Sequence, residues 1–202
     1  DPKDLWLGSK RALGEIAIKY GVIKPVPVES LIYGAEIEFG SGHIEVISTP
    51  GHAAHHLAFR YQDILFAGEA GGVYQDTGEV YMRPATPSRF FFETSINSID
   101  RLMVLDCRRI CYGHYGFAFD ARRMLGIHRD QLFLWRHVIS ATHDECKNCG
   151  EEEVLREAFE RLLEADLFFA RYSKLDGDIQ KREKYFVLNS MRGYIEYLKG
   201  KV

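Results

Sequence analysis

The chain begins with a helical pattern of apolar residues. Between residues 3 and 20, apolar side chains recur at near-helical spacing, and Gly21 follows as a stop signal. This spacing predicts an amphipathic helix. Pro25 and Pro27 come next, and they predict an extended connector, because each proline fixes its own φ and pushes the preceding residue towards the β region.

From residue 35 to residue 67 the pattern changes to a period of two. Short apolar runs, divided by turn-forming residues, occur at 37–39, 44–46, 57–59 and 64–66. They predict four strands, mostly connected by hairpins. The stretch 68–88 is rich in Gly, Pro and Thr and is interpreted as a long loop, and long loops inside compact domains are usually functional or disordered.

The second half of the chain is mostly helical in pattern. A helix is predicted over 92–105 and a short strand over 109–112, and further helices over 120–142, 151–165 and 178–199, with Gly126 as one of the interruptions. This order of elements predicts an α/β fold in which helices cover a sheet, with a helical tail.

Composition is ordinary for a globular protein. The 202 residues are 46% hydrophobic and 27% charged, with a net charge of −3. This length allows one sizeable core. A slightly acidic chain disfavours a nucleic-acid or anionic-membrane partner, and no apolar run approaches the roughly 20 residues that span a bilayer.

The cysteines and the first residues bear on the setting of the protein. Four cysteines, at 107, 111, 146 and 149, are too few for a disulfide scaffold, so we expect a reducing cytoplasm. The chain opens with Asp1-Pro2-Lys3 and has neither an initiator Met nor a signal-peptide pattern. Removal of a tag or pro-segment would explain this, but we favour a native N-terminus that lies upstream.

Three tripeptides carry the candidate chemistry: Pro50-Gly51-His52, Ala67-Gly68-Glu69 and Tyr112-Gly113-His114. Each follows a predicted strand, and a hairpin between the strands before His52 and Glu69 brings both residues to the same end of the sheet. His114 joins them if strand 109–112 runs in the same direction as strand 64–67. Two imidazoles and a carboxylate suit zinc or non-haem iron. The alternative is three unrelated turns, since histidines at strand ends are often plain loop residues.

The same segments resemble a known family. Residues 47–57 resemble the "TPGH…H" segment of the metallo-β-lactamase superfamily, 64–69 resemble its "LFxGD" turn, and 112–114 resemble its last "GH". The similarity covers about 35 to 116 and is greatest to hydroxyacylglutathione hydrolases and related thioester or lactone hydrolases. It implies the C-terminal part of an αββα sandwich, with residues 1–120 as a partial domain and 121–202 as a helical C-terminal extension.

The resemblance also implies a set of site residues. His52 would bind a first metal, Glu69 would occupy the bridging carboxylate position, and His114 would bind a second metal, with zinc favoured and iron or manganese as alternatives. His56 would orient a ligand without binding the metal itself, and the neighbouring His55 is an alternative candidate for that role. The family's bridging residue is normally Asp, so whether Glu69 bridges two metals or binds one stays open.

The family's main ligand cluster, His-x-His-x-Asp-His, is absent from the chain. In the family this cluster lies upstream of a segment like 1–34, so the resemblance implies an N-terminal truncation. We therefore expect the chain alone to bind metal poorly and to be inactive. The complete protein would use a metal-activated water to hydrolyse a small ester-, thioester- or lactone-like substrate. The alternatives are an iron-dependent oxidoreductase of the same fold and a non-catalytic member.

Other residues give weaker signals. Tyr74, Arg83 and Tyr115 are candidates for the substrate pocket, with Arg83 as a clamp for a substrate carboxylate. The alternative for Arg83 is an exposed surface residue. His143 with Cys146 and Cys149 has zinc-ligand spacing, but a turn at a helix end that carries two thiols is the favoured interpretation. Aromatic residues of the tail are expected to pack in the core first and to serve a homodimer second.

Overall fold

The structure, a computed structural model, describes residues 2–87, 89–146 and 148–200. It divides into two compact units, residues 1–34 and residues 35–202. In the first unit the predicted helix is split into α1 (Pro2–Leu13) and α2 (Glu15–Tyr20), because Gly14 between them adopts a positive φ of 55°. After α2 comes the predicted extended connector, which is interrupted by a short 3-10 turn, η1 (Val28–Ser30).

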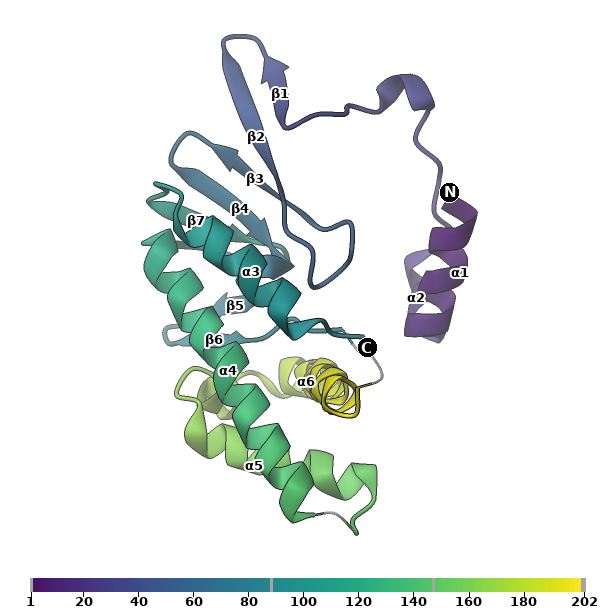
Figure 1. Ribbon diagram of the computed structural model, residues 1–202, viewed down its shortest axis with the longest axis vertical. Helices are drawn as coiled ribbons and strands as arrows, with labels where there is room; N and C mark the ends of the chain where they lie inside the picture. The colour runs from purple at the N-terminus through teal and green to yellow at the C-terminus, as the bar shows by residue number, and fades with distance from the viewer. Residues whose placement is uncertain (1, 88, 147, 201–202) are drawn as a thin grey trace. The chain divides into compact units, whose positions relative to one another are not determined.

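The second unit is built on a mixed sheet of six strands (Figure 1). The four predicted strands are confirmed as antiparallel neighbours: β1 (Glu36–Phe39), β2 (Gly42–Ser48), β3 (Leu57–Tyr61) and β4 (Ile64–Gly68). The predicted strand 109–112 is β7 (Arg109–Tyr112), and it runs parallel to β4. A short strand that the sequence did not predict, β8 (Phe117–Phe119), completes the sheet beside β7.

The helices also follow the predicted pattern, as α3 (Phe92–Met103), α4 (Ala121–Glu145), α5 (Glu151–Ala165) and α6 (Gly177–Leu198). A 3-10 segment, η3 (Phe169–Lys174), connects α5 to α6. The expected interruption at Gly126 is wrong. α4 runs without a break through Gly126, because a single glycine inside a helix costs only about 1 kcal/mol relative to alanine. Within the described ranges, no helix is long and apolar enough to cross a membrane.

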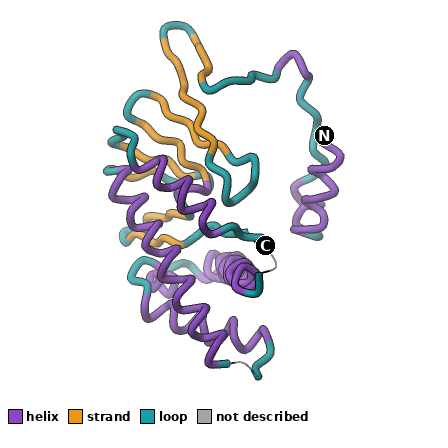
Figure 2. The backbone as a smooth tube through the Cα atoms, in the orientation of Figure 1, coloured by secondary structure: helices purple, strands orange, loops and turns teal. Residues whose placement is uncertain are grey.

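One face of the large sheet carries the core. Leu65 and Ile110 are fully buried there, and the same cluster includes Trp135, Phe159 and Tyr194 from the helices after residue 120. Figure 2 shows these helices gathered together beside the strands. The boundary expected at residue 120 stays a prediction, because the division into compact units falls at residue 34.

The other face of the sheet is partly open. The register places Phe59, Phe66, Cys111 and Phe117 in one row across four strands. Phe66 is 43% exposed and Phe117 is 56% exposed. An apolar row of this kind therefore lines the sheet next to the edge that carries the candidate ligands.

The long loop predicted over 68–88 is wrong over much of its length. A 3-10 turn, η2 (Glu69–Gly71), leads into β5 (Val73–Asp76), which pairs with β6 (Val80–Arg83) in a separate two-stranded sheet. The turn between them is made by Gly78, which has a positive φ of 95° and donates its N–H to the Asp76 side chain. An Asp-x-Gly turn between two apolar pairs was the overlooked signal.

Candidate metal centre

The candidate ligands follow three strands that end at the same edge of the sheet. β2 and β4 have the same direction because β3 runs antiparallel to both, and β7 is parallel to β4. His52, Glu69 and His114 therefore leave the sheet on one side. Glu69 is the meeting point: its Oε2 lies 3.1 Å from His56 Nε2, and its Oε1 lies 3.5 Å from His114 Nε2.

His52 is held in one tautomer. Its Nδ1 lies 2.6 Å from the backbone oxygen of Ala85, and a carbonyl can only accept, so Nδ1 carries the proton. In the neutral ring Nε2 then keeps its lone pair, which is the form that binds a metal.

The turn before His52 is fixed by α3. Ser98 Oγ donates to the Pro50 carbonyl at 2.7 Å. Gly51 has a φ of 151°, and a Cβ there would lie 3.0 Å from the Ser95 Cα and collide with the Ser95 hydroxyl. Glycine is therefore required at this position by both conformation and space.

His56 contacts both the side chain and the backbone of Glu69. Its Nδ1 lies 2.7 Å from Thr49 Oγ1, and its Nε2 lies 3.2 Å from the Glu69 backbone nitrogen as well as 3.1 Å from the carboxylate. A protonated Nε2 donates to the carboxylate and cannot at the same time accept from the Glu69 N–H. Gly68 allows this approach, since a Cβ there would lie 2.7 Å from His56 Nε2. The structure thus places His56 against Glu69, whereas His55 is exposed.

Glu69 is held as a carboxylate. The hydrogen bond from His56 is the largest cause that lowers the pKa of Glu69, to about 2, and the charges of His52 and His114 add to it, while partial burial opposes them. Gly113 leaves room for the group, because a Cβ there would lie 3.3 Å from the carboxylate. The ionised carboxylate is the form that binds a metal, and it only accepts hydrogen bonds.

The ligand edge opens into a large hollow of about 600 Å³. This volume lies in the range of small-molecule sites. Imidazole and carboxylate groups meet apolar side chains in its lining, which includes His52, His55, His56, Leu57, Phe59, Phe66, Glu69 and Cys111.

A much smaller cavity of about 20 Å³ lies behind His52 and Glu69, and its lining includes His128 from α4. His128 was not among the candidate site residues predicted from the sequence. The ring is 3% exposed, and burial lowers its pKa to about 4. Its only sequence signal is a histidine among the apolar positions of a predicted helix, and that pattern does not reveal which cavity the residue lines.

The three candidate pocket residues lie in different environments. The expected substrate clamp at Arg83 is wrong: the side chain is buried, and its Nε donates to Glu183 Oε2 on α6 at 2.6 Å. Tyr74 is also buried, with its ring stacked on Tyr112 at 4.7 Å between centroids, so it does not line the hollow. Tyr115 is 62% exposed and follows His114 in the chain.

The ligand atoms of the candidate centre are spread apart. Among all described His, Cys, Asp and Glu side chains, the one group of three or more whose ligand atoms all lie within 4.8 Å of one another is Cys146, Cys149 and Glu153. His52, Glu69 and His114 therefore do not enclose a single ion by themselves.

Comparison with known proteins agrees with this fold. The family model described as the metallo-beta-lactamase superfamily matches residues 2–114, which is more than half of the chain. The chain belongs to the metallo-beta-lactamase superfamily. It has the α/β fold of that type, with a mixed sheet and a C-terminal helical region. Members of this superfamily are mostly metallohydrolases and typically bind metal ions.

Individual relatives are distant. The metallo-beta-lactamase fold-containing protein ST1585 of Sulfurisphaera tokodaii is 29% identical over 121 residues, which make up 56% of this chain and 44% of the relative. A hydroxyacylglutathione hydrolase of Hydrogenovibrio crunogenus is 31% identical over 128 residues, or 58% of this chain and 42% of the relative. The chain thus spans less than half the length of these curated relatives.

Solved structures show the same architecture. The crystal structure of ST1585 from Sulfolobus tokodaii superposes with a TM-score of 0.56 at 25% identity, covering 64% of this chain and 50% of that chain. The metallo-beta-lactamase family protein TTHA1429 from Thermus thermophilus gives a TM-score of 0.55 at 19% identity and covers 97% of this chain and 62% of that chain.

Proposed function

We propose that the complete protein is a metal-dependent hydrolase that acts on a small ester-, thioester- or lactone-like substrate. One observation carries the proposal: an ionised Glu69 lies between His56 and His114, at the edge where His52 keeps Nε2 free, beside a hollow of about 600 Å³. The distant similarity to a hydroxyacylglutathione hydrolase supports the substrate class.

His52, Glu69 and His114 would hold the metal, and we propose two zinc ions, with iron or manganese as alternatives. Their donor set fits, because imidazole and carboxylate ligands are those that zinc accepts. When bound, the metal supplies an activated water with a pKa near 7 and polarises the substrate's carbonyl oxygen. The three residues do not enclose an ion alone, so we propose that further ligands come from elsewhere in the complete protein.

The chain's own groups position these ligands. Ala85 sets the tautomer of His52, and Thr49 orients His56, whose Nε2 lies against the Glu69 carboxylate and backbone N–H. Glu69 would hold the metal or accept a hydrogen bond from the attacking water. Partners that orient ligands typically change metal affinity or activity by 10–100-fold when they are removed.

The test is His52→Ala in the complete protein, assayed with a panel of ester, thioester and lactone substrates. We expect turnover and bound metal to fall by at least about 100-fold, since a ligand matters more than its supports, with an unchanged circular dichroism spectrum. His137→Ala is the matched control, because this histidine on α4 is exposed and does not line the hollow. Full activity in His52→Ala would remove His52 from the site.

Metal analysis of the same protein separates the alternatives. Zinc with hydrolysis of one of these substrates supports the proposal. Iron with no hydrolysis would instead favour an oxidoreductase of the same fold, and the absence of bound metal and of turnover would favour a non-catalytic member.

Two further proposals concern the setting of the protein. A reducing cytoplasmic compartment is proposed from the free thiols of Cys107 and Cys111, whereas the disulfide between Cys146 and Cys149 differs from the two free thiols that the sequence led us to expect there. A homodimer is proposed because some aromatic surface stays uncovered in the helical region, where Tyr185 is 47% exposed. Light scattering of the purified protein would decide the second point, and a monomeric mass at micromolar concentration would refute it.

A further inference from the structure

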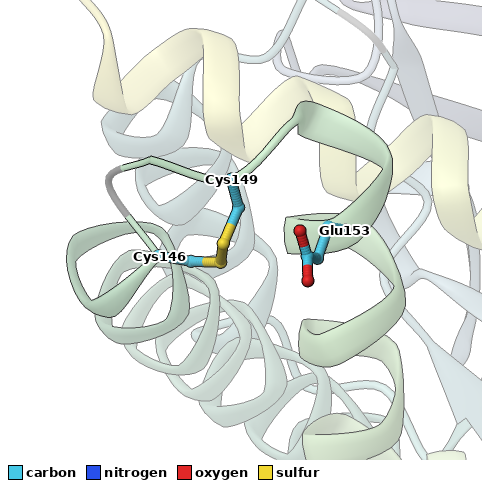
Figure 3. A group of neighbouring side chains, drawn as sticks. All are labelled: Cys146, Cys149 and Glu153. Atoms are coloured by element: carbon cyan, nitrogen blue, oxygen red, sulfur yellow. A yellow bond between two sulfur atoms is a disulfide. The ribbon is translucent and has the colours of Figure 1, made fainter.

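A second cluster of metal-ligand side chains lies at the turn between α4 and α5. Cys146 caps the end of α4, Cys149 precedes α5, and Glu153 lies in the first turn of α5. Their ligand atoms lie within 4.8 Å of one another, and Figure 3 shows the carboxylate beside the two sulfur atoms. His143, which shares the zinc-ligand spacing in the sequence, is not part of this group.

The two cysteines are joined by a disulfide, and their side chains are half-buried against the core. The remaining cysteines of the chain, Cys107 and Cys111, are free. The sulfur pair is therefore brought together by the ends of two helices, and reduction leaves two thiols next to a carboxylate.

The surrounding charges leave Glu153 available. Glu151 and Glu152, its neighbours in the same turn, pair with Arg192 of α6 at 3.4 and 2.8 Å. Among the residues that the structure describes, no cation forms an ion pair with Glu153. Cys149 lies just before the N-terminus of a 15-residue helix, where the helix dipole favours a thiolate over a thiol.

We propose that the reduced protein binds one thiophilic divalent cation of the zinc class through Cys146 Sγ, Cys149 Sγ and the Glu153 carboxylate. Thiolates select such cations, and a carboxylate completes a ligand set of mixed softness with water at a fourth position. This site is separate from the candidate centre at Glu69 and does not depend on the proposed hydrolase function.

The disulfide is the oxidised form of the same site. A dithiol reductant transfers two electrons and two protons to the disulfide, which yields the two thiols, and is itself oxidised to a disulfide. The cation then displaces the two thiol protons and forms two metal–sulfur bonds. Bound metal and disulfide therefore exclude each other, and the metal links the end of α4 to the start of α5.

Cobalt(II) is the probe, because thiolate ligands give it a charge-transfer band in the near ultraviolet that nitrogen and oxygen ligands do not give. The full-length protein is reduced with a dithiol, freed of reductant under anaerobic conditions and titrated with cobalt. We expect the band to saturate at one cobalt per chain, to be lost in Cys149→Ser, and to disappear when zinc is added. Glu153→Gln should keep a band but weaken cobalt affinity by at least about tenfold, since even supporting partners of a ligand contribute that much.

Cys111→Ser is the matched control, because Cys111 lines the hollow beside the Glu69 centre and could lend a thiolate to a metal there. The band should persist in this variant. The proposal is overturned if the reduced protein shows no band, if the band is lost with Cys111 instead of Cys149, or if Glu153→Gln binds cobalt as tightly as the wild type.

Discussion

His128 should make the stability of the protein depend on pH in a way that can be calculated. The ring lies on α4 with 3% of its surface exposed, and within the described residues its Nδ1 has no hydrogen-bond partner. It packs so closely on η2 that a Cβ at Gly72 would lie 2.7 Å from Nδ1. A charged imidazole here would lose its hydration without compensation, and burial accordingly lowers the pKa of His128 to about 4.

The direction of this pH dependence follows from proton binding by His128 in the folded and the unfolded state. The pKa of an unfolded histidine is about 6.5, so between pH 6.5 and pH 4 the unfolded chain binds the proton and the folded chain does not. The contribution of His128 to the free energy of unfolding is therefore fully present above pH 6.5 and is lost as the pH falls towards 4. The full effect is about 3 kcal/mol for a shift of about 2.5 pKa units, and the part lost between pH 7 and pH 5 is about 2 kcal/mol.

The assay is urea unfolding of wild type and His128→Leu at pH 7 and pH 5. Because other groups titrate in both proteins alike, the difference between the two pH dependences isolates His128. Wild type should lose about 2 kcal/mol more than the variant on going to pH 5. His137→Leu is the control, since His137 lies on the same helix but is exposed, and it should behave like wild type. Equal losses in wild type and His128→Leu would refute the reasoning.

Two further predictions test how the site is held. Gly51→Ala should cost about 1–3 kcal/mol of stability and reduce bound metal, because its Cβ meets Ser95. Gly126→Ala in the open interior of α4 is the control and should instead stabilise the protein by about 0.5–1 kcal/mol. Thermal unfolding measures both, and a Gly51→Ala variant as stable as the wild type would contradict the packing argument. Glu183→Gln should destabilise by about 3–5 kcal/mol because it leaves the buried charge of Arg83 unpaired. The double variant that replaces this pair with Met and Leu should recover most of that loss, and equal unfolding energies for single and double variants would contradict it.

The sheet and the position of the ligands were predictable because both depend on local pattern. A period of two specifies a strand, and two hairpins in succession return the chain to the edge it left, which places Glu69 near His52 without any knowledge of distant residues. His114 required one more assumption, the parallel direction of its strand, and the pairing of β7 with β4 supplies it.

What could not be predicted depends on contacts between distant segments. Arg83 was interpreted as a pocket residue because it lies in the predicted loop that directly follows Glu69, but its environment is set by Glu183, 100 positions away. His128 is similar: its helical position was predicted, whereas its burial depends on Gly72 and on the cavity behind Glu69. No local pattern carries this information.

The helical region takes part in organising the candidate centre. Glu183 of α6 holds Arg83, and Arg83 Nη1 in turn donates to the Pro84 carbonyl at 3.0 Å. Close by in the chain, the Ala85 carbonyl fixes the tautomer of His52. The chain thus fixes, through a buried ion pair between β6 and α6, the backbone segment that decides which nitrogen of His52 can bind a metal. A loop free to move would let His52 exchange tautomers, so a candidate metal ligand depends on Glu183, a residue near the far end of the chain.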